Sequence, residues 1–130
     1  MLVRRIWVVL VVAELVLVIG GCTPSIVSSD AGVYSTGRLY AVTSQDTTAV
    51  YDATLKAMEQ LELDVSEAAK DVFYAKVVAK GADGKTITVR IKPKEGGGTD
   101  LRIGVGTMGD RNRSTVIYER IRQNLGLSEK

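Results

Sequence analysis

The chain has no histidine and only one cysteine, two prolines, one tryptophan and one phenylalanine in 130 residues. These absences exclude zinc sites built on His or several Cys, Ser–His and Cys–His nucleophile pairs, and intrachain disulfides. A charge excess of one sign is also lacking, because 17 Lys and Arg face 15 Asp and Glu. A dedicated nucleic-acid binder carries a concentrated basic excess, so we expect no nucleic-acid partner. We also expect no metal and no cofactor.

A short basic and apolar segment opens the chain. Two arginines precede an apolar run that is interrupted at Glu14 and ends before Cys22. The 16 residues from Ile6 to Gly21 fall short of the roughly 20 that a membrane-spanning helix needs. A basic start, a short apolar stretch and small residues at its end are the layout of a secretory signal. Residues 1–21 are therefore predicted to be a signal peptide, with a plain transmembrane anchor as the weaker alternative.

The end of this segment, Ile19-Gly20-Gly21-Cys22, resembles the lipobox of bacterial lipoproteins. The resemblance implies that the Cys22 thiol receives a diacylglyceryl group, that the chain is cut before Cys22, and that the new amino terminus is acylated. Three acyl chains exceed what stable membrane anchoring needs. Thr23 stands where an Asp would resemble the inner-membrane retention signal. The resemblance thus implies an outer-membrane lipoprotein that faces the periplasm.

The remaining 109 residues divide into a tether and one domain. Residues 22–33 are small and polar, include a proline and show no period, which predicts a flexible tether after the lipidated cysteine. The 11 residues after Cys22, up to Val33, span at most about 35–40 Å. Residues 34–127 form the predicted domain, whose core must be built from aliphatic residues because so few aromatics remain. A domain of this size buries about two-thirds of its unfolded surface.

Periodicity predicts a mixed α and β domain. Strands are expected over 37–42, 73–80, 86–92 and 101–105, a short extended segment at Leu63 and Val65, and helices from Asp46 or Thr47 to Leu61 and over 112–125. In the strand at 73–80, Phe73 is expected on the same face as Ala75. Tight turns join the last three strands, so these should form an antiparallel meander with both helices on its apolar face. The predicted fold is a two-layer α+β sandwich in β-α-β-β-β-α order.

Three short motifs, together with the lipobox, carry a family resemblance. They are Gly37-Arg-Leu39 before a helix, the three-strand meander, and Leu101–Asp110 leading into Ser114–Ile121. Over most of residues 34–125 the chain resembles a family of small bacterial lipoproteins of unknown function. That resemblance implies location and fold, and no activity. In architecture alone, the element order also resembles the helix-grip repeats of lipoprotein subunits in the outer-membrane β-barrel assembly machinery.

The other face of the predicted sheet is basic. If the strand registers hold, it carries Arg38, Tyr74, Lys76, Lys80, Thr86, Thr88, Arg90, Lys92 and Arg102, with Tyr40 as a possible addition. Exposed sheet faces are commonly rich in Lys, Arg and Thr simply because they face water. If the face is an interface, Tyr74, Arg90 and Lys76 are the candidate contact residues, since aromatic residues and Arg are enriched at interfaces.

Arg111 and Arg113 stand at the start of the last helix, where cations oppose the helix dipole unless an anion binds. Together with the free N–H groups of the first turn, they form a candidate site for a phosphate or carboxylate. The alternative is two solvated arginines near a turn. The preceding segment Gly104-Val-Gly106-Thr-Met-Gly109 fits G-x-G-x-x-G, but the following parallel strand and the acidic residue that a dinucleotide site needs are missing. We interpret it as a flexible strand-to-helix turn.

No catalytic residue is expected. Asp64, Glu67 and Asp71 fall in a loop-like stretch without regular spacing, and nothing nearby should separate their pKa values. The sequence therefore predicts a non-catalytic, membrane-anchored lipoprotein that acts as an interaction or accessory module and docks on an envelope protein. The alternative is a lipoprotein that binds a small anionic ligand or the cell wall.

Overall fold

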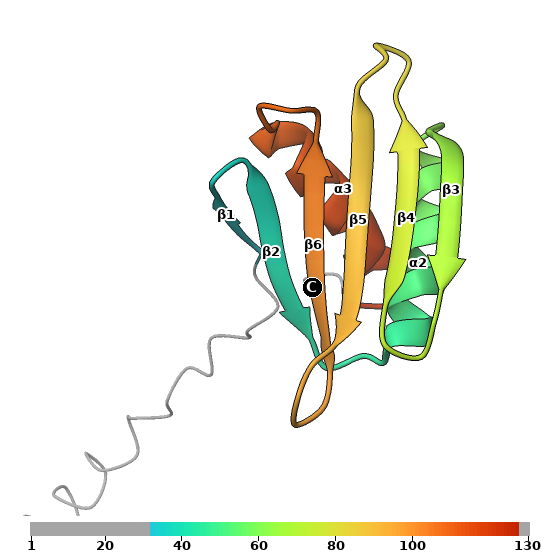
Figure 1. The fold of residues 1–130 in the computed structure, drawn as a ribbon, viewed down its shortest axis with the longest axis vertical. Coiled ribbons are helices and arrows are strands. Elements are labelled where there is room, and N and C mark those ends of the chain that lie inside the picture. Colours follow the sequence, from blue (N-terminus) through green and yellow to red (C-terminus); the bar gives the residue numbers. More distant parts are fainter. Residues whose placement is uncertain (1–31, 128–130) are drawn as a thin grey trace, which may run out of the picture.

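The structure is a computed structural model and describes residues 32–127. The predicted signal peptide, Cys22 and the tether up to residue 31 lie outside the described residues. The domain consists of one antiparallel sheet of six strands with two helices packed on one of its faces (Figure 1). This is the predicted two-layer α+β sandwich.

The sheet has the strand order β1-β2-β6-β5-β4-β3. Its strands are β1 (Val33–Ser35), β2 (Arg38–Thr43), β3 (Asp64–Lys70), β4 (Ala75–Lys80), β5 (Thr86–Pro93) and β6 (Thr99–Val105). Strands β3 to β6 form a continuous meander, and β2 pairs with β6 on the other side. The two strands with the fewest neighbours, β1 and β3, form the edges.

Helix α2 (Thr47–Gln60) lies between β2 and β3 in the chain. It begins at Asp46, whose carboxylate accepts a hydrogen bond of 2.7 Å from the Ala49 N–H and satisfies a free donor of the first turn. Its buried residues are Val50, Ala53, Thr54, Ala57 and Met58. Leu61 is the C-cap of the helix, and the next residue, Glu62, adopts a positive φ of 57°.

Helix α3 (Arg111–Asn124) has Leu125 as its C-cap, and Gly126 follows the cap. Gly126 has φ +76°, its N–H bonds to the Gln123 carbonyl at 3.0 Å, and the Leu127 N–H bonds to the Arg122 carbonyl at 2.9 Å. This pair of bonds is the Schellman motif that a glycine stop provides. Ile117 and Ile121 are buried against the sheet.

The core lies between the helices and the inward face of the sheet. Alternation along β2, β4, β5 and β6 sends every second side chain into it, and the same alternation leaves the opposite face open. The largest fully buried side chains are Met58, Ile87, Ile91, Ile103, Ile117, Ile121, Val50, Val77, Val89, Val105, Thr54 and Thr99.

Three local predictions differ from the structure. Asp64, Glu67 and Asp71 were expected in a loop, but Asp64 and Glu67 belong to the seven-residue strand β3. All seven residues of β3 are exposed, so no alternation marks the strand in the sequence. Phe73 does not share the buried face of β4, since it precedes the strand in the hairpin turn and is exposed. Strand β1, three residues long, was not predicted.

Candidate functional site

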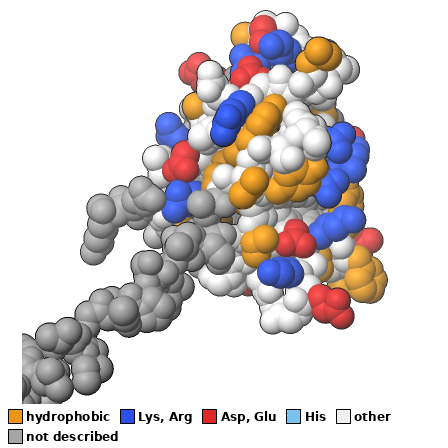
Figure 2. All heavy atoms as spheres, turned by 90° about the vertical axis from the view of Figure 1, so that its left-hand side faces the viewer, with side chains coloured by type: hydrophobic (Ala, Val, Ile, Leu, Met, Phe, Trp, Pro, Cys, Tyr) orange, Lys and Arg blue, Asp and Glu red, His pale blue; other side chains and the backbone are white. Residues whose placement is uncertain are grey.

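The open face of the sheet brings basic side chains from neighbouring strands into one row. Register pairs Lys76 with Arg90, Arg90 with Arg102, and Arg102 with Tyr40. In a strand register, opposite residues on one face lie about 4.5–5.5 Å apart at Cβ. The row therefore joins strands β4, β5, β6 and β2. Figure 2, which faces the β1 edge, shows Lys and Arg side chains gathered on the right-hand side, the side of the open face.

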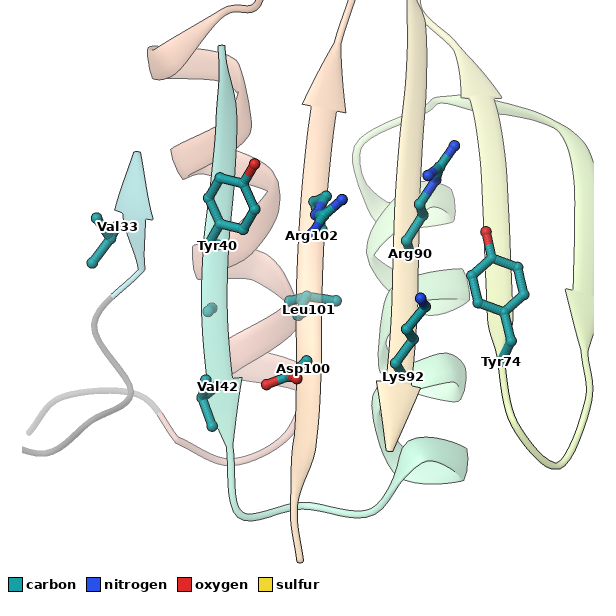
Figure 3. A pocket seen from close by; sticks show the side chains of 10 residues that line it. Val33, Tyr40, Val42, Tyr74, Arg90, Lys92, Asp100, Leu101 and Arg102 are labelled. Atoms are coloured by element: carbon teal, nitrogen blue, oxygen red, sulfur yellow. The ribbon is translucent and has the colours of Figure 1, made fainter. Parts of the chain in front are cut away.

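A hollow of about 490 Å³ lies over this row. Tyr40 and Tyr74 stand at its two sides, with Arg102, Arg90 and Lys92 between them (Figure 3). The guanidinium of Arg102 lies 4.9 Å from the centre of the Tyr40 ring, and the ammonium of Lys92 lies 5.9 Å from that of Tyr74. Both separations are within the range of a cation–π interaction. The rest of the lining comprises Val33, Ala41, Val42, Asp100 and Leu101.

Within the described part of the chain, none of the arginines of this face forms an ion pair with a carboxylate. The ion pairs within residues 32–127 are Lys76–Glu67 at 3.7 Å, Arg113–Asp83 at 2.9 Å and Arg122–Glu119 at 3.2 Å. None of them involves Arg38, Arg90 or Arg102. Arg90 and Arg102 lie directly opposite each other on β5 and β6, and like charges in this position destabilise a sheet. An anion bound between them would remove that repulsion.

A smaller niche of about 40 Å³ adjoins the hollow. Arg38, Arg90 and Arg102 surround it, the Thr88 hydroxyl group lies on the same face, and Gly104 forms its floor. A Cβ atom at Gly104 would lie 3.8 Å from two atoms of the Arg38 side chain, in van der Waals contact with it, so glycine leaves this space free beside Arg38. Three guanidinium groups around one small space suit an oxyanion, since Arg binds phosphate and carboxylate in a two-pronged geometry.

The structure does not bring Arg111 and Arg113 together in one site. Arg113 donates to both carboxylate oxygens of Asp83, at 3.0 and 2.9 Å, whereas Arg111 lies 5.8 Å from the centre of the Tyr34 ring. The hydrogen bond from Arg113, followed by the one from the Lys85 N–H, holds the pKa of Asp83 below its ordinary value of 3.8. The same bond to Asp83 raises the pKa of Arg113.

The start of α3 already has an anion of its own. The Asp110 carboxylate accepts a hydrogen bond of 3.0 Å from the Arg113 N–H and acts as the helix N-cap. A second anion at this place would be repelled by the Asp110 carboxylate, and Arg113 would offer it little attraction because its guanidinium is paired with Asp83. Of the two candidate anion-binding regions, the open face is the better one, because the ion pairs of residues 32–127 include Arg113 but not Arg90 or Arg102.

The glycine-rich segment begins in β6, which holds Gly104, and its second half, from Gly106 to Gly109, is the predicted turn between strand and helix. Strand β6 is antiparallel to both of its neighbours, which is not the parallel arrangement of a dinucleotide-binding fold. The Gly106 N–H bonds to the Thr86 carbonyl at 2.8 Å, and Gly109 packs against Gly37 of the β1–β2 turn.

The acidic residues of β3 do not belong to a metal site: among the described residues, no group of three or more His, Cys, Asp or Glu could hold a metal ion.

Two parts of the open-face site were missed at the sequence level. Tyr74, Arg90 and Lys76 were singled out, and Tyr74 and Arg90 line the hollow while Lys76 adjoins Arg90. Arg38, Lys92 and Arg102 were placed on the basic face but not among the candidate contact residues, and Gly104 was placed only in the glycine-rich segment. The sequence does contain a pattern that indicates them: an arginine stands at a polar position in each of three strands, and a glycine lies within one of these strands.

Fold and site together define a small α+β sandwich domain with a basic open sheet face. A family model described as "Protein of unknown function (DUF3568)" matches residues 5–124, and the chain belongs to this family. No curated protein matches the sequence significantly. Neither of the helices in the described part of the chain is long and apolar enough to cross a membrane.

Proposed function

We propose that the chain is a membrane-anchored, non-catalytic lipoprotein whose open sheet face docks an acidic segment of another envelope protein. The observation that carries the proposal is the cross-strand pair Arg90–Arg102, which has no carboxylate partner within residues 32–127. Two neighbouring cations weaken the isolated sheet. An acidic partner converts this repulsion into two charge-assisted contacts.

The sequence supports the anchor. Cys22 follows a basic start, an apolar run and Gly20-Gly21, as in a lipobox. We propose that residues 1–21 are removed, that Cys22 carries the lipid, and that the domain faces the periplasm from the outer membrane. The short tether then keeps the domain near the bilayer.

The composition of the hollow favours a protein partner. Tyr and Arg are enriched at protein interfaces, and they dominate the binding energy where they lie near the centre. Tyr40, Tyr74, Arg90 and Arg102 form the walls of the hollow, and valines from β1 and β2 add apolar surface. The proposal contains no catalytic step.

The test is in-cell crosslinking of the tagged full chain, followed by mass spectrometry. We expect a stoichiometric envelope protein that is lost at least about tenfold with Arg90→Glu plus Arg102→Glu, because like charges across an interface cost several kcal/mol. The matched control is Lys56→Glu plus Arg120→Glu, which makes the same charge change on helices α2 and α3. Equal capture by both double variants, or capture of cell-wall fragments or lipid alone, would overturn the proposal.

A second function, binding of a small oxyanion, is favoured by the niche at Gly104. It replaces Arg111 and Arg113 by Arg38, Arg90 and Arg102 as the anion-binding residues, because Arg113 is held by Asp83. Inorganic phosphate titrated into the protein in a calorimeter is the probe. Gly104→Val should abolish phosphate binding without unfolding, since Gly104 is a strand residue outside the group with positive φ. Thr86→Val, on the same face outside the niche, should bind phosphate as before. Equal binding by both variants would reject the niche.

A further inference from the structure

Two hollows lie on the open face, with the niche between them. The niche shares Arg90 and Arg102 with the hollow of about 490 Å³. On its other side lies a second hollow, of about 420 Å³, which we call the polar hollow. The residues common to the niche and the polar hollow are Arg38, Thr88 and Gly104. Because neighbouring spaces share walls, the three form one groove.

The groove runs along strand β5. Alternate residues of this strand face the open side, and they line the three spaces in chain order from the last to the first. Lys92 lines the hollow, Arg90 the hollow and the niche, Thr88 the niche and the polar hollow, and Thr86 the polar hollow. The distance from Lys92 to Thr86 in a strand is about 20 Å. The groove therefore fits an elongated small molecule with its anion near the middle.

The end of the groove at the hollow is the apolar one. Besides the two tyrosine rings, its walls include the side chains of Val33 and Val42, which register places on the open face. Asp100 stands opposite Lys92 at this end (Figure 3). The acidic and basic residues offset each other there, so the excess of positive charge lies at the niche.

The other end, the polar hollow, is rich in hydroxyl groups. Thr86, Thr88 and Thr107 belong to its lining, together with the cations Arg38 and Lys85. Among the described residues that line it, none is an Asp or a Glu. A group that carries hydroxyls finds hydrogen-bond partners here, whereas a cationic group is repelled.

The order of apolar space, anion niche and polar space specifies the chemical class of the ligand. A carboxylate or a phosphate monoester carries one substituent, so it can fill the niche and only one of the hollows. A phosphodiester carries a substituent on each side of its charged oxygens. Three guanidinium groups around the niche suit those oxygens.

We propose that the groove binds a phospholipid whose headgroup is uncharged and bears hydroxyls, as glycerol does. The phosphate lies at the niche, the headgroup in the polar hollow, and the lipid glycerol with the first acyl methylenes between Tyr40 and Tyr74. This inference rests on the second proposed function, oxyanion binding at the niche. The lipid and an acidic protein partner would compete for Arg90 and Arg102.

The test compares three probes by calorimetric titration into the full chain in a nonionic maltoside detergent, after subtraction of titrations into detergent alone. The probes are glycerophosphoglycerol, 1-hexanoyl-lysophosphatidylglycerol and 1-hexanoyl-lysophosphatidylcholine. We expect the hexanoyl glycerol lipid to bind at least about tenfold more tightly than glycerophosphoglycerol, because burial of two methylenes corresponds to about that factor. The choline lipid has the same acyl chain but a cationic headgroup. It should bind about fivefold more weakly than the glycerol lipid, because Arg38 and Lys85 repel it.

Two variants assign the ends of the ligand. Val42→Ser with Tyr74→Ala should remove the gain from the acyl chain and leave glycerophosphoglycerol binding unchanged, because neither residue lines the niche. Thr86→Val should weaken the binding of glycerophosphoglycerol and leave that of inorganic phosphate unchanged.

The outcomes separate the phospholipid from the oxyanion site. If inorganic phosphate binds but the three probes bind with equal affinity, the phospholipid is overturned and oxyanion binding stands. If neither phosphate nor any probe binds, both are overturned. Preference for the glycerol lipid that both variants retain would place the lipid outside the groove and would also overturn the inference.

Discussion

Gly109 packs against Gly37 so closely that no side chain fits between them. A Cβ atom on Gly109 would lie 2.6 Å from both the Cα and the carbonyl oxygen of Gly37. The contact joins the turn after β6 to the turn between β1 and β2. It explains why glycine stands at the last position of the G-x-G-x-x-G segment without any nucleotide.

Gly109→Ala should therefore be costly. It combines a left-handed backbone, worth about 1–2 kcal/mol, with a clash against backbone atoms, worth about 1–3 kcal/mol. We expect a loss of about 2–5 kcal/mol in the free energy of unfolding, measured by urea denaturation. Gly96→Ala is the control, because Gly96 also has a positive φ of 87° but nothing within 4 Å of a Cβ atom. Equal losses would contradict the packing argument.

Substitutions just after the two helices are expected to change thermal stability in opposite directions. Glu62 adopts φ +57° at the end of α2, where Gly126 adopts φ +76° at the end of α3. Glu62→Gly should raise the midpoint of thermal unfolding, by an amount that corresponds to about 0.5–1 kcal/mol, because the positive φ costs glycine nothing. Gly126→Ala should lower the midpoint by a similar amount. A loss of stability on Glu62→Gly would show that the Glu62 side chain makes an unrecognised contribution.

Repulsion between Arg90 and Arg102 predicts a stability gain that depends on salt. Arg90→Thr should raise the free energy of unfolding by about 0.2–1 kcal/mol at low ionic strength. The gain should shrink near 1 M salt, where the screening length falls to about 3 Å. Lys80→Thr is the control, because Lys80 lies opposite Thr86 and Asp64 and not opposite a cation. A stability loss on Arg90→Thr at low salt would contradict the proposed repulsion.

The Asp83–Arg113 pair predicts a dependence on acid. The pKa of Asp83 is lowered in the folded chain, first by Arg113 and then by the Lys85 N–H, so its contribution is present above the ordinary value of 3.8. That contribution is lost as the pH falls through the lowered pKa. Arg113→Gln should thus unfold more readily than the parent chain at neutral pH, and the difference should vanish in strong acid. A difference that persists unchanged in acid would assign the effect of Arg113 to packing.

Much of the fold follows from periodicity in the sequence. Alternation in β5 and β6 identifies the buried and open faces because each strand has one wet and one dry side. The same principle explains why β3 was predicted only as a short extended segment at Leu63 and Val65: both of its faces are exposed, so Asp64 and Glu67 carry no pattern that separates strand from loop. In the sequence, Phe73 extends the alternating pattern of β4. In the structure, Phe73 lies in the turn closed by the hydrogen bond from the Asp71 N–H to the Tyr74 carbonyl, before the strand begins.

The candidate site was less predictable because it depends on register. The sequence places Arg90 and Arg102 on polar positions, but only the pairing of β5 with β6 sets them side by side. Likewise, the sequence shows no partner for Arg113 near the helix start. The fold places the carboxylate of Asp83, 30 residues away, 2.9 Å from the Arg113 guanidinium. Periodicity can identify a face, whereas the partners on it come from long-range pairing.

The most direct test of the account is site-specific photocrosslinking in cells from the two faces of the sandwich. A photoreactive phenylalanine analogue replaces Tyr40 on the open face or Val116, which is 54% exposed on α3. The account predicts that one envelope protein is captured from Tyr40 and not from Val116, and that capture is lost with Arg90→Glu plus Arg102→Glu. Capture of the same protein from Val116, or capture from Tyr40 that survives both charge reversals, would contradict docking on the open face.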